Sequence, residues 1–233
     1  MPEGNNIHRY HRSIKNVVGK RITTGTGKGA IVKRVFPKGK VIFLQLSNGK
    51  TIIMRFGMSG YLSRDKSPPR YTRKTLEFNG AAPIHWVSMR KLGTVRYVST
   101  AVAQRVVDSL GPDPLIENVN TIRRQLDSGR QRTQLGALLL DQSFLSGIGN
   151  RLRAQILWEA KLSPFRTLET LSSSEKDTLA RLIKEVMRDR PYAGNVYRRT
   201  RDSLGHPVTR MTIGGRTMWF VYTPKSKRVS QKK

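Results

Sequence analysis

Apolar residues recur at helical spacing just after the N-terminus. Ile7, Tyr10, Ile14 and Val17 would lie on one face of a helix, and Gly19 is a natural place for that helix to stop. Packing of this face against a core would hold the first residues of the chain in a fixed place.

The pattern changes to short strands between about Ala30 and Val98. Asn48-Gly49 and Asn79-Gly80 are strong hairpin-turn signals with apolar runs on both sides. Short antiparallel strands at this spacing predict a β-sandwich or barrel. The charged segment Ser63–Lys74 contains two consecutive prolines and is expected to be an exposed, mobile loop. The predicted strands are Lys40–Leu46, Thr51–Phe56, Leu76–Phe78, Ile84–Val87 and Val95–Val98.

After Thr100 the spacing of apolar residues becomes helical, and Gly111-Pro112-Asp113-Pro114 indicates a break. The last part returns to β, with two strands joined by Gly214-Gly215. The chain is therefore predicted to be α+β. The predicted helices are Val119–Leu126, Thr133–Leu140, Arg151–Ala160 and Ser174–Met187, the last capped within Ser172–Ser174, and the final strands are Val208–Ile213 and Arg216–Tyr222.

The charge balance is strongly basic. Lys and Arg number 44 against 15 Asp and Glu, which gives a net charge of +29 in 233 residues. Such an excess points to a polyanionic partner, above all nucleic acid. No apolar stretch approaches the roughly 20 residues that a membrane span needs, and no signal-peptide core is present, so we expect an intracellular protein, with the compartment open, and no membrane partner.

The sequence offers little for metal or redox chemistry. It contains no cysteine, which excludes disulfides and thiolate zinc sites. The four histidines show no ligand spacing, so we expect no metal and no cofactor. The four histidines are His8, His11, His85 and His206.

Met1-Pro2-Glu3-Gly4 carries the most informative chemistry. Removal of Met1 would leave the secondary amine of Pro2, and an α-amino group titrates near ~8, so that part of it is a free nucleophile at neutral pH. Its adduct with an aldehyde carbon is an iminium, which is charged without protonation. Glu3 stands beside it to give or take a proton. Taken alone, these four residues are better explained as an ordinary N-terminus.

A second candidate motif is Leu145-Ser146-Gly147-Ile148-Gly149-Asn150, between two predicted helices. Its glycines would let the backbone turn and present amide groups at a helix N-terminus, a site suited to phosphate, with the Asn150 side chain as a further donor. A plain helix–helix turn explains the motif equally well.

Taken in order, these motifs resemble the formamidopyrimidine-DNA glycosylase / endonuclease VIII family of base-excision repair enzymes. The resemblance extends over most of the chain. Its motifs are Pro2-Glu3-Gly4, Gly39-Lys40 on a strand, Phe56-Gly57-Met58-Ser59-Gly60, Leu110-Gly111-Pro112-Asp113-Pro114-Leu115, Asp141-Gln142, Gly147-Ile148-Gly149-Asn150 in a helix–two-turn–helix, and Gly214-Gly215-Arg216-Thr217.

The resemblance implies a role for each matched residue. Pro2 would attack the anomeric carbon of a damaged nucleotide, Glu3 would protonate the sugar ring oxygen, and elimination of the 3′ phosphate would follow. Lys40 is placed among the catalytic residues, and Lys40, Asn150 and Arg216 match the phosphate clamp around the lesion. For Lys40 alone, a solvated surface lysine is the simpler interpretation.

Chemistry on a base requires its extrusion from the stack. By the resemblance, Met58, Arg90 and Leu92 fill the gap that the base leaves. Met58 and Leu92 could equally be core residues, and Arg90 a phosphate contact.

The C-terminal hairpin departs from the family pattern, which usually has four zinc-binding cysteines there. Val208, Met211, Val221 and Pro224 stand near those positions, and none binds zinc. The apolar run Met218–Tyr222 could pack the hairpin instead. The chain therefore resembles the endonuclease VIII-like members with a zinc-less finger, which occur in eukaryotes and giant viruses.

Three further departures bear on activity. Asn6 and Gln155 each replace a glutamate common in the family, which puts base release in more doubt than lyase chemistry. The link from about Arg188 to Arg198 is short where purine-excising members have a lesion-capping loop. Oxidised pyrimidines or hydantoins are therefore the expected lesions.

These features together predict a monomeric, bifunctional DNA glycosylase and abasic-site lyase, with damaged DNA in a basic cleft. The expected domains are 1–105, an N-terminal β-sandwich; 106–190, a helix–two-turn–helix domain; 191–225, a zinc-less finger; and 226–233, a disordered basic tail. A non-catalytic basic nucleic-acid-binding protein is the alternative, and a family member that keeps only lyase activity is a milder one.

Overall fold

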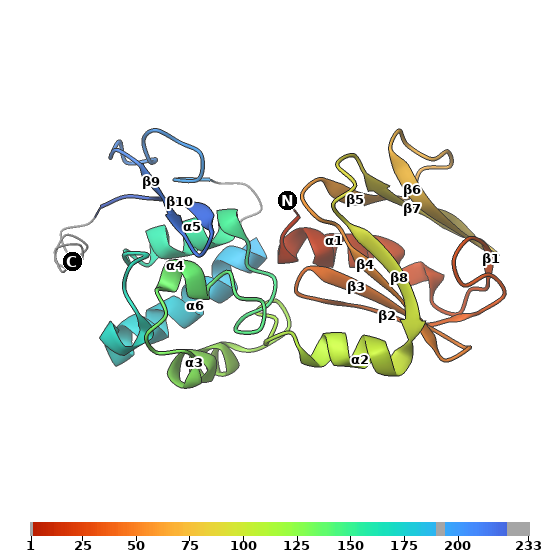
Figure 1. Cartoon of the computed structure of the whole chain (residues 1–233), viewed down its shortest axis with the longest axis horizontal. Helices are drawn as coiled ribbons and strands as arrows, with labels where there is room; N and C mark the ends of the chain where they lie inside the picture. Colours follow the sequence, from red (N-terminus) through yellow and green to blue (C-terminus); the bar gives the residue numbers. More distant parts are fainter. Residues whose placement is uncertain (1, 190–193, 223–233) are drawn as a thin grey trace. The chain divides into compact units, whose positions relative to one another are not determined.

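A computed structural model describes residues 2–189 and 194–222 of the chain (Figure 1). The chain forms two compact units, Met1–Leu110 and Gly111–Lys233. The predicted tail 226–233 lies outside the described residues, as does Pro224. The finer division into 106–190 and 191–225 stays a prediction. In the described part, no helix has both the length and the apolar character that crossing a membrane requires.

The first unit begins with the predicted amphipathic helix. This is α1 (Gly4–Ile14), followed by the short 3-10 helix η1 (Lys15–Val17). Ile7, Ile14 and Val17 are fully buried in the core of the unit. His11 Nε2 lies 3.1 Å from the carbonyl oxygen of Val35, and burial lowers the pKa of His11 despite that contact. The helix that follows Pro2 is therefore anchored.

Two antiparallel sheets form a sandwich over this core. One has the order β1-β6-β7-β5 and the other β2-β3-β4-β8. Both contribute inward residues to a single cluster, such as Ile84 from the first and Ile42 from the second. The strands are β1 (Ile22–Thr24), β2 (Val32–Lys38), β3 (Val41–Leu46), β4 (Lys50–Arg55), β5 (Gly60–Ser63), β6 (Thr72–Phe78), β7 (Ala81–Ser88) and β8 (Thr94–Ser99).

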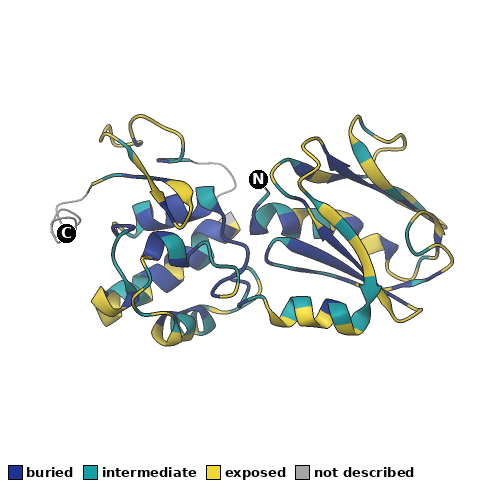
Figure 2. Cartoon of the chain, in the orientation of Figure 1, coloured by how far each residue is buried: buried dark blue, intermediate teal, exposed yellow. Residues whose placement is uncertain are grey.

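The second sheet is covered on its other face as well. Val41, Phe43 and Ile53 alternate with the inward residues and pack with Ala103 of α2 (Thr100–Asp108). Burial on both faces explains why β3 is apolar almost without interruption (Figure 2). The α+β class and the N-terminal sandwich are confirmed.

Two predictions for this unit are wrong in detail. Gly39 and Lys40 form the turn between β2 and β3 and are not on a strand, because Lys38 already pairs with Val41 and Gly39 has φ +56°. The segment Ser63–Lys74 is not all loop. Ser63, the last residue of β5, pairs with His85 of β7, and Thr72, the first residue of β6, pairs with Val87 of β7.

The second unit is helical around its own core. The predicted capping at the start of α6 is confirmed, since the Glu175 N–H donates to Ser172 Oγ and the Ser172 N–H to the Glu175 carboxylate. Thr133 and Gln134 stay outside their predicted helix. The helices are α3 (Val119–Ser128), α4 (Leu135–Leu138), α5 (Asn150–Glu159), η2 (Leu168–Thr170) and α6 (Ser173–Asp189).

The C-terminal hairpin belongs to this unit. It consists of β9 (Thr209–Ile213) and β10 (Arg216–Phe220), joined by Gly214-Gly215, both with positive φ. Ile213, Met218 and Phe220 are buried in the core of the helices. The hairpin is therefore held to the helices by apolar side chains, as the apolar run Met218–Tyr222 predicted for a hairpin without zinc ligands.

Candidate functional site

Pro2 lines a pocket in the first unit. The pocket has a volume of about 270 Å³ and is lined by Pro2, Lys40, Arg55, Phe56, Gly57, Leu92 and Thr94. Two of the predicted residues, Pro2 and Lys40, are thus brought together from different parts of the chain. Leu92, predicted as a gap-filling residue, borders the same space. The roles predicted for these residues remain predictions.

Arg55 is a member of this pocket that the sequence analysis missed. Val41 pairs with Arg55 and Arg55 with Thr94, so the turn residue Lys40 and the end of β4 lie at one edge of the sheet. Burial, with repulsion from Arg96, lowers the pKa of Arg55. An arginine guanidinium nevertheless keeps its proton in proteins. The only feature of the sequence that could have marked Arg55 is that it is a charged residue at the end of an apolar strand.

Glu3 is the N-cap of α1 and is 2% exposed. Its backbone N–H donates to Asn6 Oδ1 at 3.1 Å, and its carbonyl accepts from the Asn6 and Ile7 N–H groups. Asn6 therefore fixes the entry into the helix directly after Pro2. An amide in this place performs the capping but, unlike a carboxyl group, does not titrate and so cannot give or take a proton.

Two loops meet at the mouth of the pocket. A Cβ added to Gly57 would lie 2.5 Å from the carbonyl carbon and oxygen of Leu92, so the two backbones are in direct contact. The Arg90 N–H also donates to Ser59 Oγ at 3.3 Å. The loop that carries Met58 and the loop that carries Arg90 and Leu92 thus form one surface.

The predicted gap-filling residues lie on that surface. Met58 is 43% exposed and Leu92 57%, so the interpretation of either one as a core residue is wrong. Arg90 is exposed too. Met89, 58% exposed in the same loop, is a further apolar residue that the sequence analysis did not single out. Such exposed apolar side chains are typical of a contact surface.

In the second unit, Gln142 shapes the glycine motif. Its Nε2 donates to the Ile148 carbonyl at 3.0 Å and its Oε1 accepts from the Gly147 N–H at 3.0 Å. Gly147 has φ +98°, a conformation that favours glycine. Gly149 is the N-cap of α5 and brings no side chain to it, so backbone amides form this end of the helix, an arrangement suited to an anion.

Asn150 and the hairpin residue Arg216 come together in this unit. Asn150 opens α5, and its Nδ2 donates to the carbonyl of Thr217 at 2.8 Å. Arg216 is exposed beside that carbonyl, at the start of β10. The predicted phosphate contacts Asn150 and Arg216 therefore adjoin one helix N-terminus.

Three of the residues predicted to stand near zinc-ligand positions make packing contacts of the hairpin. Val208 and Val221 pack against the helical core. Met211 is 45% exposed and accepts a hydrogen bond from the Tyr222 hydroxyl on its sulfur. In the part of the chain that is described, no cluster of three histidine or acidic residues is arranged to hold a metal.

Gln155, the other departure, has a structural use. It is 4% exposed, its Nε2 donates to Glu159, and its Oε1 accepts from the Asn195 N–H at 3.0 Å. It thereby ties α5 to the segment after α6. The link predicted to be short, 188–198, lies partly outside the described residues.

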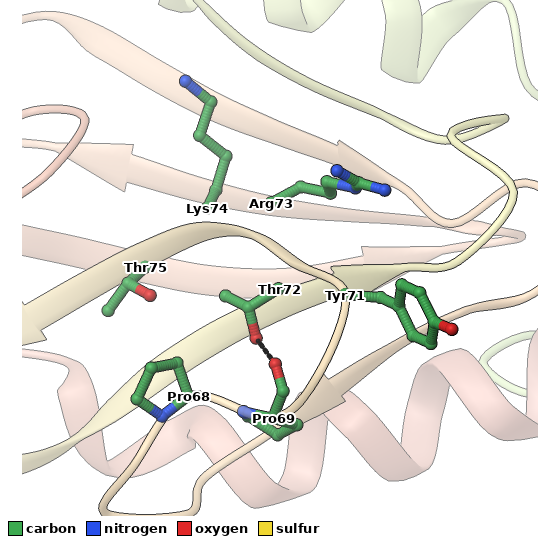
Figure 3. Close-up of a pocket in the computed structure, with 7 residues that line it drawn as sticks. All are labelled: Pro68, Pro69, Tyr71, Thr72, Arg73, Lys74 and Thr75. Atoms are coloured by element: carbon green, nitrogen blue, oxygen red, sulfur yellow. Dashed lines mark hydrogen bonds between the residues drawn. The ribbon is translucent and has the colours of Figure 1, made fainter.

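A second pocket of about 420 Å³ lies at the start of β6 and shares no lining residue with the Pro2 pocket. Its lining comes only from 68–75, where Thr72 Oγ1 donates to the carbonyl of Pro69 and the charged ends of Arg73 and Lys74 point away from the prolines (Figure 3). Carboxylates and histidines are absent from its lining. Among the side chains that serve as general acids or bases, only Tyr71 and Lys74 line it.

Comparisons with known proteins agree with this arrangement. The formamidopyrimidine-DNA glycosylase N-terminal domain matches residues 24–95, and the H2TH domain of the same enzymes matches residues 110–197. A formamidopyrimidine-DNA glycosylase of Acidiphilium cryptum is 31% identical over 170 residues, covering 71% of this chain and 61% of the relative. The match thus spans less than two thirds of that relative's length.

Solved structures share the fold. The chain aligns with the MutM (Fpg) protein of Thermus thermophilus at a TM-score of 0.79 and 24% identity, covering 97% of this chain and 98% of that one. It aligns with Lactococcus lactis formamidopyrimidine DNA glycosylase, non-covalently bound to DNA with an abasic site, at a TM-score of 0.77 and 20% identity, covering 94% and 97%.

Two adjoining matches, to a sandwich domain and to a helix–two-turn–helix domain, place the chain in a class of two-unit DNA-repair folds. The chain belongs to the formamidopyrimidine-DNA glycosylase / endonuclease VIII family. The narrower prediction of an endonuclease VIII-like member stays a prediction.

Proposed function

We propose that this protein is a base-excision repair DNA glycosylase with abasic-site lyase activity that acts through an iminium on Pro2. The observation that carries the proposal is the pocket that joins Pro2 to Lys40 and Arg55, bordered by the loop of Leu92. Relatives named formamidopyrimidine-DNA glycosylase and the net charge of +29 support it.

The neighbouring cations suit the nucleophile. Once Met1 is removed, Pro2 carries a secondary amine, and like charges on Lys40 and Arg55 favour its neutral form. The same two cations attract the phosphates next to a lesion. One pocket thereby provides both a free amine and a site for the charged backbone.

The chemistry follows from that amine. Its lone pair attacks C1′ of the nucleotide, and the base leaves with the electrons of its bond to C1′ and takes up the proton that the Pro2 nitrogen gives up. Glu3 then protonates the ring oxygen as the C1′–O4′ bond breaks and the nitrogen lone pair forms the iminium. The resulting iminium acidifies C2′. Loss of the C2′ proton then expels the 3′ phosphate, and a second elimination would release the 5′ phosphate.

DNA is the proposed partner, bound by a monomer without metal or cofactor. The exposed residues Met58, Arg90 and Leu92 occupy the place of a flipped base, and Asn150 and Arg216 bind phosphate. Oxidised pyrimidines or hydantoins are the proposed lesions, on the ground of the short link before the hairpin.

Borohydride trapping tests the proposal. The protein, shown by mass to have lost Met1, is mixed with abasic-site DNA and borohydride, which reduces the iminium to a stable amine. We expect a covalent complex on a denaturing gel. A variant with an N-terminal extension, in which the Pro2 nitrogen becomes an amide, should not be trapped but should bind DNA with unchanged salt dependence.

Pro2→Gly completes the set. Glycine has a primary amine in place of the secondary one, and its adduct is a neutral imine until it is protonated, so trapping should be strongly reduced while DNA binding persists. Absence of trapping with the authentic N-terminus would favour a non-catalytic nucleic-acid-binding protein. Trapping on abasic DNA without excision of any oxidised base would favour a family member that keeps only lyase activity.

A further inference from the structure

Arg153 is a buried arginine on α5 that the proposed chemistry does not use. Its side chain is large and its exposure is 0%. Arginine is almost never fully buried unless it is paired. No carboxylate pairs with it within the described residues; backbone carbonyls surround it instead.

The guanidinium bonds to four carbonyl groups. Nη1 donates to Gly136 of α4 and, at 3.1 Å, to Ile213 at the end of β9. Nη2 donates to Arg216 at 3.1 Å and to Thr217 at 3.2 Å, both in β10. A single side chain thus connects α5 to α4 and to both strands of the hairpin on either side of its turn.

The hairpin turn is seated tightly at this point. A Cβ on Gly214 would lie 3.0 Å from Ala137 Cα, so the turn packs directly on α4. Asn150, which lies one turn before Arg153 on α5, donates to the same Thr217 carbonyl that Arg153 binds. Arg153 therefore adjoins both residues proposed to contact phosphate.

The planar shape of the group matters for this arrangement. A guanidinium presents several N–H donors in a fixed fork, whereas a lysine ammonium is a single point. Burial first, and then repulsion from Arg216, lowers the pKa of Arg153 to about 10, so the group stays cationic at neutral pH. It therefore adds positive charge beneath Arg216.

We propose that Arg153 is a positioning residue that fixes Arg216 for phosphate contact and stabilises the hairpin without zinc. The proposal rests on the DNA-binding role proposed above for Arg216. Hydrogen bonds from α5 to the Arg216 and Thr217 carbonyls set where β10 begins, and so where the Arg216 side chain leaves the backbone.

A double-mutant cycle tests this role. Affinity is measured by fluorescence anisotropy for a duplex with a tetrahydrofuran abasic analogue and for the same duplex undamaged. The proteins are wild type, Arg153→Met, Arg216→Ala and the double variant. Arg181→Met is the matched control, because Arg181 is an exposed arginine on α6 that pairs with Glu185.

We expect Arg153→Met to weaken binding to the analogue at least about tenfold, a change of about 1.4 kcal/mol. Arg181→Met should leave binding unchanged. In the Arg216→Ala background, Arg153→Met should cause little further loss, because Arg153 acts through Arg216. Arg153→Lys, which keeps the positive charge but not the fork of N–H donors, should lose affinity as well. It replaces Arg153→Met in the cycle if circular dichroism shows that Arg153→Met does not fold.

Equal loss from the Arg153 change in both backgrounds would reduce Arg153 to a structural residue and overturn the inference. So would wild-type affinity in Arg153→Met. Unchanged affinity in Arg216→Ala alone is a different result, since it removes the phosphate role proposed for Arg216 and the positioning role with it. The single and double variants therefore separate the two failures.

Discussion

Gly57→Ala should damage both the stability of the sandwich and the Pro2 pocket. Gly57 follows β4 with φ +57°, in the left-handed region that favours glycine. A Cβ there would lie 2.5 Å from the Leu92 carbonyl carbon and oxygen and 2.8 Å from the Gly93 nitrogen. All three are backbone atoms, so rotation of a side chain cannot relieve the contact.

The loss of stability in Gly57→Ala has two parts, the cost of a positive φ for alanine and the overpacking by the added Cβ. Gly49, just before the other end of β4, provides a control for the first part. Gly49 has φ +73° with nothing within 4 Å of an added Cβ, so Gly49→Ala carries only the backbone term. That term is about 1–2 kcal/mol. At Gly57 the overpacking against Leu92 and Gly93 adds about 1–3 kcal/mol. Gly57→Ala should therefore lower the free energy of unfolding by about 1–3 kcal/mol more than Gly49→Ala does.

Urea unfolding followed by far-UV circular dichroism measures this difference, and borohydride trapping on abasic-site DNA measures its effect on the pocket. We expect reduced trapping in Gly57→Ala and wild-type trapping in Gly49→Ala, because only the former displaces the loop of Leu92. Equal destabilisation of the two variants, with equal trapping, would refute the close contact between the two loops.

Three further predictions concern charge and metal. Lys40→Ala and Arg55→Ala should each weaken DNA binding and reduce the slope of log affinity against log salt by about 0.9, measured by anisotropy across a salt series; an unchanged slope would remove that residue from the phosphate contacts. Burial opposes ionisation of Asp202, but hydrogen bonds from Trp158 and His206 outweigh it and lower its pKa to about 2 from 3.8. A depressed carboxyl pKa stabilises the fold above about pH 4, and the stabilisation is lost as pH falls through about 2. Asp202→Asn should therefore be less stable than wild type by about 1–3 kcal/mol in urea unfolding near neutral pH, and the difference should shrink as pH falls from about 4 to about 2. Treatment with 1,10-phenanthroline should leave strand cleavage unchanged, because apolar residues such as Met218 and Phe220 pack the hairpin; inhibition would point to a metal site.

Local signals predicted most of the secondary structure. The spacing of Ile7 and Ile14 predicted α1, and the Asn-Gly and Gly-Gly turns predicted the hairpins, because such turns need positive φ. One misplaced residue, Thr72, shows how tertiary pairing overrides local preference. Thr72 joins β6 through its partner Val87, although the charged sequence around it is typical of a loop.

The candidate site was predicted only in part, for a similar reason. The motifs named Pro2 and Lys40, but nothing local marked Arg55 as their neighbour. Its place depends on the register of β3, β4 and β8, which brings Lys40, Arg55 and Thr94 to one edge. Register is a property of several strands at once, and a single residue type carries no trace of it.

The sequence by itself indicated the proposed kind of partner and the candidate nucleophile and fixed the absence of cysteine ligands, because charge and chemical groups are properties of residue types and do not depend on the fold. Only the tertiary structure decided which residues meet. It exposed Met58 and Leu92 where apolarity alone allowed a core position, and it buried the charged Arg153 where composition favours the surface. Burial and contact arise from segments distant in sequence, so they follow from the packing of the whole unit.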